Sequence, residues 1–469
     1  MSSSDGEKHQ VARRLVDLQA CIEFLQETGN LLRVKTEVDP EYELAGIMQK
    51  LYKSGCGKAI LFERVKDSPY SLLSGMLLNR EVVASLFAVP ANEVSAFFGR
   101  ALESWRRDKQ AIPSAILEHG PANEVISDEV NLFSLPVPLH ALRDGGRYFN
   151  SSVMIVKNPE TGIPNISLRR FMVTAKDRMT FLIDPERHLG EYLAIAEARN
   201  ETLPITLNIG MGPAVWFAAA MPKQGDGKVG IANHMIGKPV NFIKTQTVDT
   251  LAFADAQFVV EGEILPGVRE DEGPCAEVTG HYAERDKRWV MRVTGITHRK
   301  KPVFQTLLSG PESFVATGFS GEGNLLEAVK DKVPEVRAVY LSAAGGGYYQ
   351  AIVQVDNQRE GVGREAIKET FEAFNPLQWV VAVDTDVDLY DANDVTWAIS
   401  TRFNADTDLI LLKNQFGHTL NPMSTMNADG KGATITKMGM DAMVPFSRKE
   451  ELVRVAFKEV NLDDYDIQE

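Results

Sequence analysis

The sequence of 469 residues predicts a protein of mixed α/β and β class, with three domains and a terminal helix. Segments of strand and helix character alternate up to about residue 110 and again after about residue 320, which is typical of α/β domains. Between these regions, short β-rich runs separated by turns are typical of a barrel-like β domain. We therefore expect an N-terminal α/β domain, a central β-barrel domain, a C-terminal α/β domain and a final helix over residues 1–118, 119–312, 313–446 and 447–469.

The first predicted element is an amphipathic helix over residues 11–29. Gly29 is suited to end this helix, and its apolar residues recur at helical spacing at Leu15, Leu18, Ile22 and Leu25. The alternation of the N-terminal domain then continues through five segments, at residues 31–34, 44–52, 59–62, 82–87 and 94–105.

In the central domain, residues 158–162 form a hairpin-type connection between strands predicted over residues 151–157 and 163–171. Further strands are expected at residues 203–209, 256–262 and 289–298. Because strands outnumber helices here, the domain is predicted to be built around a curved sheet.

In the C-terminal domain, helices are expected over residues 325–333 and 364–374, and buried strands over residues 336–341, 349–355, 379–383 and 409–412. The final helix is predicted to begin at Ser447, with Glu450 as its capping-box partner. Its apolar residues form a stripe that needs a covering surface, for which a neighbouring subunit is one candidate: Leu452, Val453, Val455, Ala456 and Val460.

Composition excludes several classes of function. A formal net charge of -14 argues against a nucleic-acid partner, and no run approaches the roughly 18 apolar residues of a membrane-spanning helix. The N-terminus lacks the apolar stretch of a secretory signal. The three cysteines are distant and odd in number, which fits a reducing cytosol rather than a disulfide framework or a zinc site: Cys21, Cys56 and Cys275.

Two glutamates, Glu272 and Glu277, are the candidate catalytic pair. They lie five residues apart, and the Gly-Pro step between them prevents a helix. The alternative is that both are solvated acids of a charge run that also holds Glu270 and Asp271. Glu277, however, leaves that run and enters apolar surroundings, where burial would favour the protonated carboxyl and suit it to donate a proton near neutrality.

A polar cluster in the predicted hairpin contains arginines, one of which could pair with these two glutamates. On a strand, Asn165, Ser167 and Arg169 share one face and Arg170 lies on the other, so a common ligand would require a twist or bulge. The alternative is a surface hairpin with its polar residues outward. An arginine between two glutamates keeps one carboxylate ionised and favours the proton on the other, which makes a proton-transfer device.

His188 is a candidate metal ligand, because imidazole commonly binds metals and the carbonyl oxygen of Asn165 is a plausible second ligand. A single histidine is more often an ordinary surface or core residue. Two other patterns predict no site. The segment 384–388 lacks the later residues of a calcium loop, and the glycines 345–347 are predicted to form a turn rather than a phosphate loop.

Together, Asn165-x-Ser167-x-x-Arg170, His188 and Glu272-Gly-Pro-x-x-Glu277 resemble the signature of the UbiD family of prenylated-flavin-dependent decarboxylases. The resemblance extends over nearly the whole chain. It implies a split β-barrel that binds prenylated FMN, with a divalent metal (Mn²⁺ or Mg²⁺) and often K⁺ at the flavin phosphate. It also implies reversible decarboxylation of an aromatic, heteroaromatic or α,β-unsaturated acid, a flavin prenyltransferase as cofactor supplier, and a homodimer or larger homo-oligomer.

The resemblance also assigns roles to residues. Arg170 would hold the substrate carboxylate, Glu277 would deliver the proton that replaces carbon dioxide, and Glu272 would orient and charge-balance Arg170. Asn165 and His188 would bind the metal. The implied cofactor-binding positions are Asn165, Ile166, Ser167, Leu168, Arg169, Arg170, Arg187, His188, Lys228 and Lys437.

One position departs from the family pattern. The family's third metal ligand is a glutamate, and gap-free counting from Glu272 or from Lys244 reaches Lys228 in this sequence. A hard divalent cation bound by one asparagine and one histidine would be weakly held. There are three alternatives: the Lys228 ammonium replaces the metal and pairs with the flavin phosphate, the preceding loop shifts so that Asp226 becomes the ligand, or the chain binds the flavin poorly or differs in function.

Two rival functions remain. The first is a non-catalytic flavin-binding or assembly protein of the same fold, which Lys228 favours. The second is a flavin reductase, which would need neither the Glu-Arg-Glu set nor the large flanking domains. The presence of Arg170, Glu272 and Glu277 favours the decarboxylase.

Overall fold

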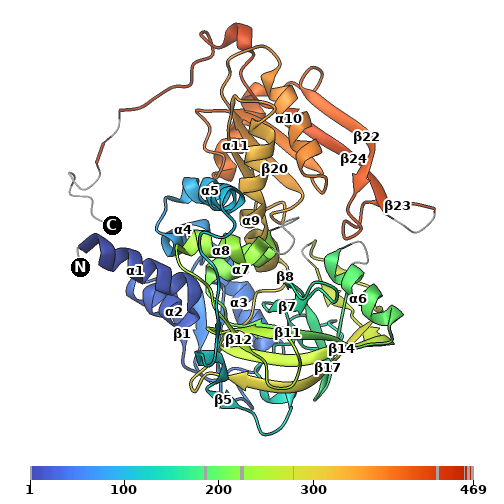
Figure 1. Cartoon of the computed structure of the whole chain (residues 1–469). Coiled ribbons are helices and arrows are strands. Elements are labelled where there is room, and N and C mark those ends of the chain that lie inside the picture. Colours follow the sequence, from blue (N-terminus) through green and yellow to red (C-terminus); the bar gives the residue numbers. More distant parts are fainter. Residues whose placement is uncertain are drawn as a thin grey trace.

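The computed structural model describes residues 3–183, 187–221, 227–277, 279–428, 432–458, 460–461 and 465. Three larger sheets organise these residues: a four-stranded sheet near the N-terminus, a nine-stranded central sheet and a six-stranded C-terminal sheet. Figure 1 shows the C-terminal sheet and its helices stacked on the rest of the molecule. The mixed α/β and β fold class predicted from the sequence is confirmed.

The N-terminal sheet has the order β1-β2-β3-β18, with strands at Leu31–Val34, Ala59–Phe62, Ser71–Ser74 and Val303–Gln305. The strands predicted at residues 31–34 and 59–62 are confirmed. Strand β18 follows the central sheet in the chain but pairs in parallel with β3, so the two regions share a structural element. The helices of this region are α1, α2, α3, α4 and α5, at Ser3–Val16, Leu18–Glu27, Glu43–Lys53, Arg80–Phe87 and Val94–Arg107.

The single helix predicted over residues 11–29 is wrong, because the chain forms two helices that meet at Asp17. The Asp17 carboxylate accepts a hydrogen bond from the Gln19 backbone N–H at 2.9 Å, which caps the start of α2. The same carboxylate pairs with Arg299 at 3.1 Å. Local capping and a distant ion pair therefore override the continuous apolar spacing.

The central sheet has the order β6-β9-β10-β17-β14-β11-β7-β8, and β5 pairs with β17. In chain order, strands β5 to β11 comprise Val125–Ile126, Tyr148–Phe149, Val153–Lys157, Pro164–Leu168, Phe171–Ala175, Arg178–Phe181 and Leu203–Ile209. The long strands β14 and β17 comprise Phe258–Glu272 and Asp286–His298. The predicted hairpin is confirmed as β7 and β8, with Val156 paired to Asn165.

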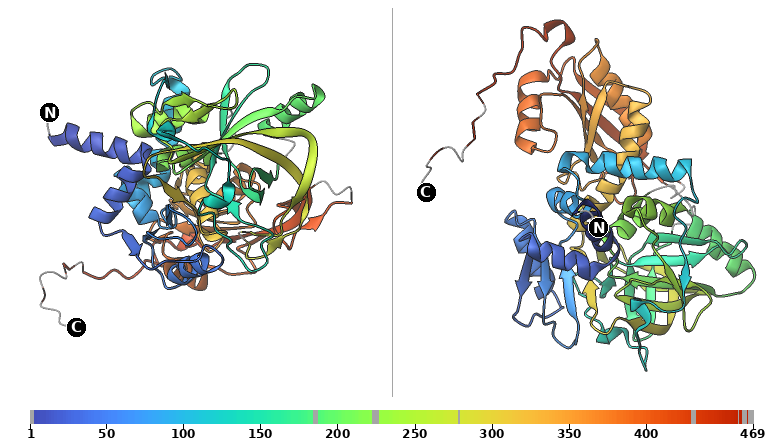
Figure 2. Two further views of the ribbon diagram at one scale, coloured as in Figure 1. Left: turned by 90° about the horizontal axis from the view of Figure 1, so that it is seen from below. Right: turned by 60° about the vertical axis from the view of Figure 1, so that its left-hand side comes forward.

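The central sheet curls back on itself. Strands β6 and β9 lie at one end of the strand order and β7 and β8 at the other, yet residues 150–152 join β6 to β7 and residues 169–170 join β8 to β9. Connections of this length span only about 10–15 Å. The Ser152 hydroxyl donates to the Arg169 carbonyl at 3.2 Å, which ties the two connections together. The curl is visible in Figure 2 and agrees with the predicted split barrel, whose full closure stays a prediction.

Three helices accompany the central sheet: α6, α7 and α8, at His188–Ala198, Pro213–Ala220 and Lys228–Ile236. Every residue of α7 except the last is buried. A helix that is apolar on all sides shows no amphipathic period, which is why the sequence analysis missed it. Two small sheets complete the region, β4-β12-β13 (Ile116–Leu117, Phe242–Lys244, Leu251–Phe253) and β15-β16 (Cys275–Ala276, Tyr282–Ala283).

The C-terminal sheet has the order β19-β20-β21-β24-β22, and β23 pairs with β24. Strands β19 to β24 comprise Val336–Leu341, Gln350–Val355, Trp379–Asp384, Leu409–Gly417, Thr425–Met426 and Ala433–Asp441, in agreement with the four predicted strands. The helices are α9, α10 and α11, at Pro311–Lys330, Val362–Ala373 and Ala392–Arg402. Helix α9 is longer than predicted and packs against both α5 and β19, so it joins the C-terminal sheet to the N-terminal helices.

A buried ion pair reinforces this junction. The Glu322 carboxylate on α9 is fully buried and accepts from the guanidinium of Arg80, at the start of α4, at 2.5 Å. It also accepts from the Ser95 hydroxyl on α5 and from the Leu341 backbone N–H on β19. One carboxylate therefore connects four elements.

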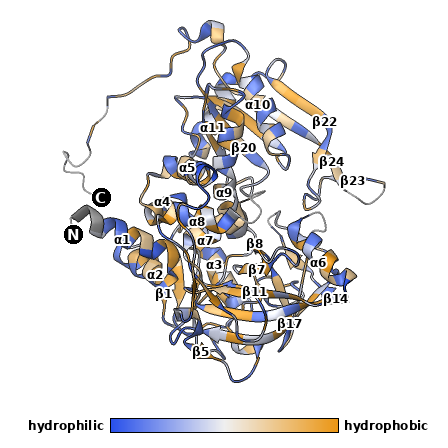
Figure 3. Ribbon diagram, viewed as in Figure 1, coloured by the Kyte–Doolittle hydropathy of each residue, from blue (hydrophilic) through white to orange (hydrophobic). Residues whose placement is uncertain are grey.

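The terminal helix predicted from Ser447 to Val460 is wrong for the residues described there, which form a 3₁₀ turn at Phe446–Arg448, further turns to residue 452, and then chain without regular secondary structure. Figure 1 shows this tail leaving the body of the molecule, and Figure 3 shows apolar residues along it. Phe457 is 88% exposed. An isolated short helix is marginal in water, so the apolar stripe cannot stabilise a helix without a surface to cover it.

No single helix in the described ranges has the length and apolar character to cross a membrane, although α4 together with residues 91–107, bent by 81°, meets these criteria as a pair.

Candidate active site

The candidate catalytic arginine and one glutamate form a direct ion pair. Arg170 lies between β8 and β9, and its Nη1 donates to Oε1 of Glu277 at 2.8 Å. The two side chains are 28% and 10% exposed. Burial opposes the charge of Arg170, but the surrounding Cys275, Glu277 and Glu272 outweigh it and raise the pKa of the guanidinium above its ordinary value. Arg170 therefore stays a cation in this site.

The second glutamate, Glu272, reaches Arg170 through a tyrosine. The Tyr148 hydroxyl on β6 donates to Oε1 of Glu272 at 2.9 Å, and the Arg170 guanidinium lies 5.4 Å from the centre of the Tyr148 ring. Glu272 and Tyr148 are both buried. Sequence reasoning missed Tyr148, because it lies in a two-residue strand that no motif marks. The Glu-Arg-Glu set is thus brought together, with Tyr148 between Glu272 and Arg170.

The loop that joins the two glutamates is held by close backbone contacts. Gly273 has a φ of +90°, and a Cβ at Gly145 would lie 2.1 Å from the Gly273 carbonyl oxygen. The Gly145 N–H donates to the Pro274 carbonyl at 2.7 Å, and the Ala276 N–H donates to the Asp144 carboxylate at 2.8 Å. These contacts fix the path of the chain from Glu272 to Glu277.

Cys275 lies between the glutamates but is not suited to act as a nucleophile. Burial raises the pKa of its thiol to about 12, against the lowering effect of Arg170 and with smaller contributions from nearby carboxylates. The side chain packs against Tyr148 and Met172. A protonated, buried thiol is a packing group.

We predict that Tyr148→Phe lowers turnover by about tenfold to a hundredfold, because it removes the direct hydrogen bond of a buried carboxylate. Arg288 Nε, at 4.0 Å from Glu272, is too distant to replace it. Steady-state rates on any acid that the wild-type protein converts would measure the loss. Tyr70→Phe, which removes a hydroxyl from the long 3.4 Å contact with His298, is the matched control. Wild-type turnover in Tyr148→Phe would contradict the role.

A second group consists of three basic residues, Lys228 and the two arginines that act on it electrostatically, Arg169 and Arg187. Lys228 is the first residue of α8, and its Nζ donates to the carbonyl oxygen of Ala219 at the end of α7 at 2.8 Å. Burial and then the positive charges of Arg169 and Arg187 lower the pKa of Lys228 to about 7. Arg187 directly precedes α6 and Lys228 begins α8, so two of these basic residues lie at the N-terminal ends of helices. This arrangement is suited to bind an anion such as phosphate.

The metal-binding roles of Asn165 and His188 stay a prediction. His188 is 54% exposed, and its Nδ1 lies 3.5 Å from the carboxylate of Glu191 on the same helix. Asn165 is buried in β8. The residues described by the structure contain no group of three or more His, Cys, Asp or Glu side chains able to hold a metal ion. Asp226, the alternative ligand, lies outside these residues.

The remaining predicted cofactor residues fall into two groups. Residues 165–168 lie on β8, which is an edge strand of the described sheet and pairs there only with β7. The backbone N–H and C=O groups on the other edge of β8 therefore make no hydrogen bonds within this sheet. Ile166 is buried in the hydrophobic core and Leu168 packs against it, so these two residues would reach a cofactor through the backbone. Lys437, by contrast, donates to the Asn375 carbonyl at 2.7 Å within the C-terminal domain, and no contact in the described residues connects it to the three basic residues.

Two tyrosines of the C-terminal domain also approach the site. The predicted glycine turn is confirmed, since Gly346 and Gly347 both have positive φ, and it leads directly into Tyr348 and Tyr349. The Tyr349 hydroxyl is buried without a hydrogen-bond partner among the described side chains. Burial, with the charges of Tyr348 and Glu277, raises the pKa of Tyr349 to about 12. The C-terminal domain therefore places a neutral hydroxyl within the electrostatic influence of Glu277.

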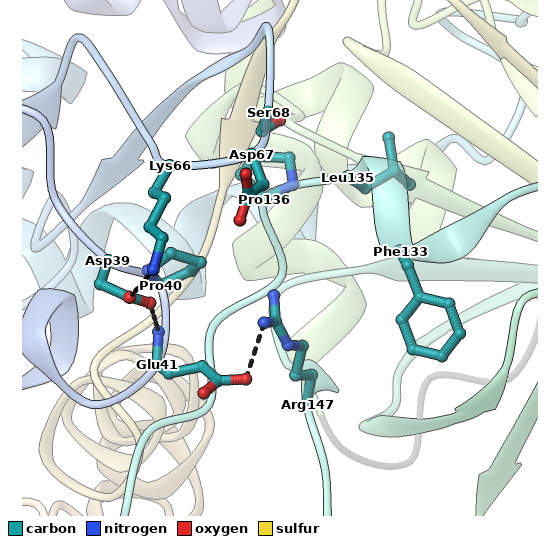
Figure 4. A pocket seen from close by; sticks show the side chains of 10 residues that line it. All are labelled: Asp39, Pro40, Glu41, Lys66, Asp67, Ser68, Phe133, Leu135, Pro136 and Arg147. Carbon is teal, nitrogen blue, oxygen red and sulfur yellow. Dashed lines mark hydrogen bonds and ion pairs between the residues drawn. The ribbon is translucent and has the colours of Figure 1, made fainter.

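A separate cavity of about 270 Å³ lies between the N-terminal sheet and the central region (Figure 4). Lys66 pairs with Asp39 at 2.8 Å and Arg147 with Glu41 at 3.0 Å. The residues that line this cavity include none of the predicted site residues. Its two basic residues are paired with two acidic residues of the same lining. We therefore assign no catalytic role to this cavity.

Comparison with known proteins identifies the class. Models of the N-terminal, Rift-related and C-terminal domains of 3-octaprenyl-4-hydroxybenzoate carboxy-lyase match residues 22–102, 115–312 and 315–442. The chain is 40% identical over 459 residues to an uncharacterized protein in the cooM 5′ region of Rhodospirillum rubrum, covering 97% of each. It is 32% identical over 440 residues to anhydromevalonate phosphate decarboxylase of Methanothermobacter thermautotrophicus, covering 93% of this chain and 99% of the relative.

Solved structures agree. The UbiD-class enzyme HmfF from Pelotomaculum thermopropionicum in complex with FMN gives a TM-score of 0.88 at 32% identity, covering 96% of this chain and 100% of that chain. An evolved dimeric form of HmfF in complex with prFMN gives a TM-score of 0.84 at 31% identity, covering 96% of this chain and 99% of that chain. The chain belongs to the UbiD family. It is a decarboxylase, an enzyme of the carboxy-lyase class.

Proposed function

We propose that the enzyme uses prenylated FMN to decarboxylate an aromatic, heteroaromatic or α,β-unsaturated carboxylic acid reversibly. The observation that carries this proposal is the partly buried ion pair between Arg170 and Glu277, with Glu272 linked to it through Tyr148. A permanent cation beside two carboxylates can hold an acid substrate and move a proton at the same place.

Arg170 is proposed to hold the substrate carboxylate. A guanidinium has five N–H donors, and its bond to Glu277 uses one of them, which leaves donors for a second carboxylate. Its raised pKa keeps that charge available. Tyr148 and Glu272 would keep Arg170 in place, because they are buried and bonded to each other before any substrate arrives.

Glu277 is proposed to deliver the proton. When the bond between the substrate carbon and its carboxylate breaks, carbon dioxide leaves and the carbon must receive a proton. Glu277 is only 10% exposed, so water has little access to compete with it. In the reverse direction the same carboxylate would remove the proton.

We also propose a position for the phosphate end of the flavin cofactor. The relatives of known structure contain FMN or prFMN, and here Arg187 and Lys228 lie where two helices begin, with Arg169 acting electrostatically on Lys228. Residues 165–170 would hold the cofactor beside them. When bound, the prenylated flavin supplies the electron sink for decarboxylation, while the protein supplies orientation and the proton. Lys437 and a K⁺ ion stay predictions from the family resemblance.

The relatives indicate only the chemical class of the substrate, a carboxylic acid, and not the particular acid. Their names include decarboxylases of anhydromevalonate phosphate, gallate and phenolic acids. The acid substrate, a flavin prenyltransferase as supplier, a homo-oligomer, the four domain ranges and a cytosolic location are part of the proposal. The exposed apolar tail is available for contact with another subunit.

The experiment that tests the cofactor assignment is a mass spectrum of the small molecule released from protein co-expressed with a flavin prenyltransferase. We expect the mass of prenylated FMN. Release of plain FMN only, or of no flavin, would contradict the assignment and favour a flavin reductase or a non-catalytic protein.

A further inference from the structure

The Asp144 carboxylate is bound to the chain immediately before Glu277. Its Oδ1 accepts a hydrogen bond from the Ala276 backbone N–H at 2.8 Å. We infer that Asp144 is a positioning residue of the active site, which holds the backbone at Glu277 so that this carboxyl group reaches the substrate carbon. The inference rests on the proposed function, in which Glu277 delivers the proton, and it adds a residue that no sequence motif marks.

Both oxygens of the Asp144 side chain are engaged, and by different parts of the chain. Oδ1 holds the Ala276 N–H, whereas Oδ2 accepts from the Ala141 N–H at 3.0 Å. The Asp144 N–H donates in turn to the Ala141 carbonyl at 3.0 Å, which closes a tight turn. The carboxylate therefore joins this turn to strand β15, whose last residue is Ala276.

Close backbone contacts on either side of Asp144 keep the turn and the loop together. The Gly145 N–H donates to the Pro274 carbonyl at 2.7 Å, and a Cβ at Gly145 would lie 2.1 Å from the Gly273 carbonyl oxygen. The Arg143 N–H donates to the Tyr282 hydroxyl at 3.2 Å, and Tyr282 lies in β16, which pairs with β15. The turn is therefore bound to both strands of the small hairpin that precedes and follows Glu277.

The other end of the same segment is bound to the central sheet and to the second glutamate. The Val173 N–H donates to the Arg147 carbonyl at 2.8 Å, and the Arg147 guanidinium pairs with Glu41 at 3.0 Å. Tyr148 follows directly and donates to Glu272 at 2.9 Å. One short segment therefore holds the catalytic loop at both of its ends, next to each glutamate.

The chemistry of this contact requires two acceptor oxygens. Burial raises the pKa of Asp144 and the Glu277 carboxylate adds to this effect, whereas the N–H groups of Ala141 and Ala276 and the Arg170 cation act against it. A carboxylate offers an acceptor oxygen to each N–H, but an amide offers only one and presents an NH₂ group instead of the other. Asp144→Asn therefore keeps the shape of the side chain and leaves one backbone N–H without its acceptor.

The first measurement is the turnover per bound flavin of Asp144→Asn and Asp144→Ala, each loaded with prenylated FMN and given an acid that the wild type converts. We expect kcat to fall about tenfold in the first variant and about a hundredfold in the second, because a displaced proton donor slows the chemical step. The KM should change by less than about twofold. Counting per bound flavin separates slower catalysis from loss of folded protein. Wild-type kcat in both variants, or a raised KM alone, would overturn the inference.

The matched control is Glu261→Gln, which also replaces a carboxylate by its amide. Glu261 is buried on β14 and accepts hydrogen bonds from the Gln246 and Thr247 N–H groups, at 3.0 Å and 2.7 Å, in the connection between β12 and β13. We expect its turnover per bound flavin to equal that of the wild type. An equal loss in Glu261→Gln and Asp144→Asn would overturn the inference, because any weakened backbone contact would then have the same effect.

The second measurement asks whether Asp144 acts through Glu277. Asp144→Asn and Glu277→Gln are made singly and together, and their single-turnover rates are compared. We expect Asp144→Asn to slow the wild type about tenfold and to add less than about twofold once residue 277 cannot donate a proton. The same fold loss in both backgrounds would mean that Asp144 acts independently of Glu277, and would overturn the inference.

These outcomes are distinct from a failure of the proposed function. Wild-type turnover in Glu277→Gln would remove the proposed proton donor, and the role of Asp144 with it. A large loss in Glu277→Gln with wild-type turnover in Asp144→Asn would leave the proposed function intact and overturn only the positioning role.

Discussion

Glu277→Gln is expected to lower turnover by about a hundredfold to ten-thousandfold while leaving flavin affinity unchanged. Glutamine has nearly the same shape and can still accept the hydrogen bond that Arg170 donates at 2.8 Å. It cannot donate the proton that the substrate carbon needs. The loss should therefore appear in the rate of the chemical step, and single-turnover rates on an acid that the wild type converts would measure it.

The matched control is Glu284→Gln, which removes a carboxylate from the exposed chain after the same loop. We expect wild-type turnover in this variant, because Glu284 is exposed and lies beyond the site. Wild-type turnover in Glu277→Gln would remove Glu277 from the mechanism. A parallel loss in both variants would mean that the loop, and not the proton donor, had been disturbed.

Arg80→Met is expected to lower the free energy of unfolding by about 3–5 kcal/mol. The substitution leaves the fully buried Glu322 carboxylate without its cation at the junction of α4, α5, α9 and β19. The cost comes mainly from the uncompensated charge, so a second substitution, Glu322→Met, should recover much of the loss. Chemical denaturation of the single and double variants would measure both effects.

Arg33→Met provides the comparison, because Arg33 pairs with Glu63 at 2.6 Å but is 43% exposed. Exposed ion pairs contribute about 0–1 kcal/mol, so this variant should be nearly neutral. Equal losses in Arg80→Met and Arg33→Met would show that burial does not decide the strength of these pairs. A double variant less stable than Arg80→Met would show that the cost is lost packing.

The strands of this fold were predictable where they are short and apolar. Residues 31–34, 59–62, 203–209 and 336–341 were predicted as separate segments and coincide with β1, β2, β11 and β19. Strand β14 was predicted only to residue 262, because its continuation to Glu272 is polar and partly exposed. Helix α7 was missed for the opposite reason, since it is buried on every side.

The terminal helix shows what a sequence pattern leaves open. The residues from Ser447 to Val460 have helical spacing, but a helix of that length needs a surface against which to pack. In one chain that surface is absent from the described structure, and Val453 and Val455 remain exposed. The pattern therefore predicts a helix that would depend on a partner.

The charged residues of the candidate site were predictable from the sequence, whereas the tyrosines near them were not. Arg170 and Glu277 meet as expected although 107 residues separate them, because the curled sheet brings the end of β8 to the loop after β14. Tyr148 and Tyr349 carry no motif, and only the structure shows that Tyr148 lies against Arg170 and that Glu277 acts electrostatically on Tyr349. Lys437 was assigned by resemblance alone, and the structure places its ammonium against Asn375.

The measurement that tests the central claim most directly compares turnover of one protein with two cofactors. Wild-type protein loaded with prenylated FMN and the same protein loaded with plain FMN are each given aromatic, heteroaromatic and α,β-unsaturated acids, and carbon dioxide release is followed. We predict release from at least one of these acids with prenylated FMN and none with plain FMN. No release with prenylated FMN, or equal release with both cofactors, would contradict the account.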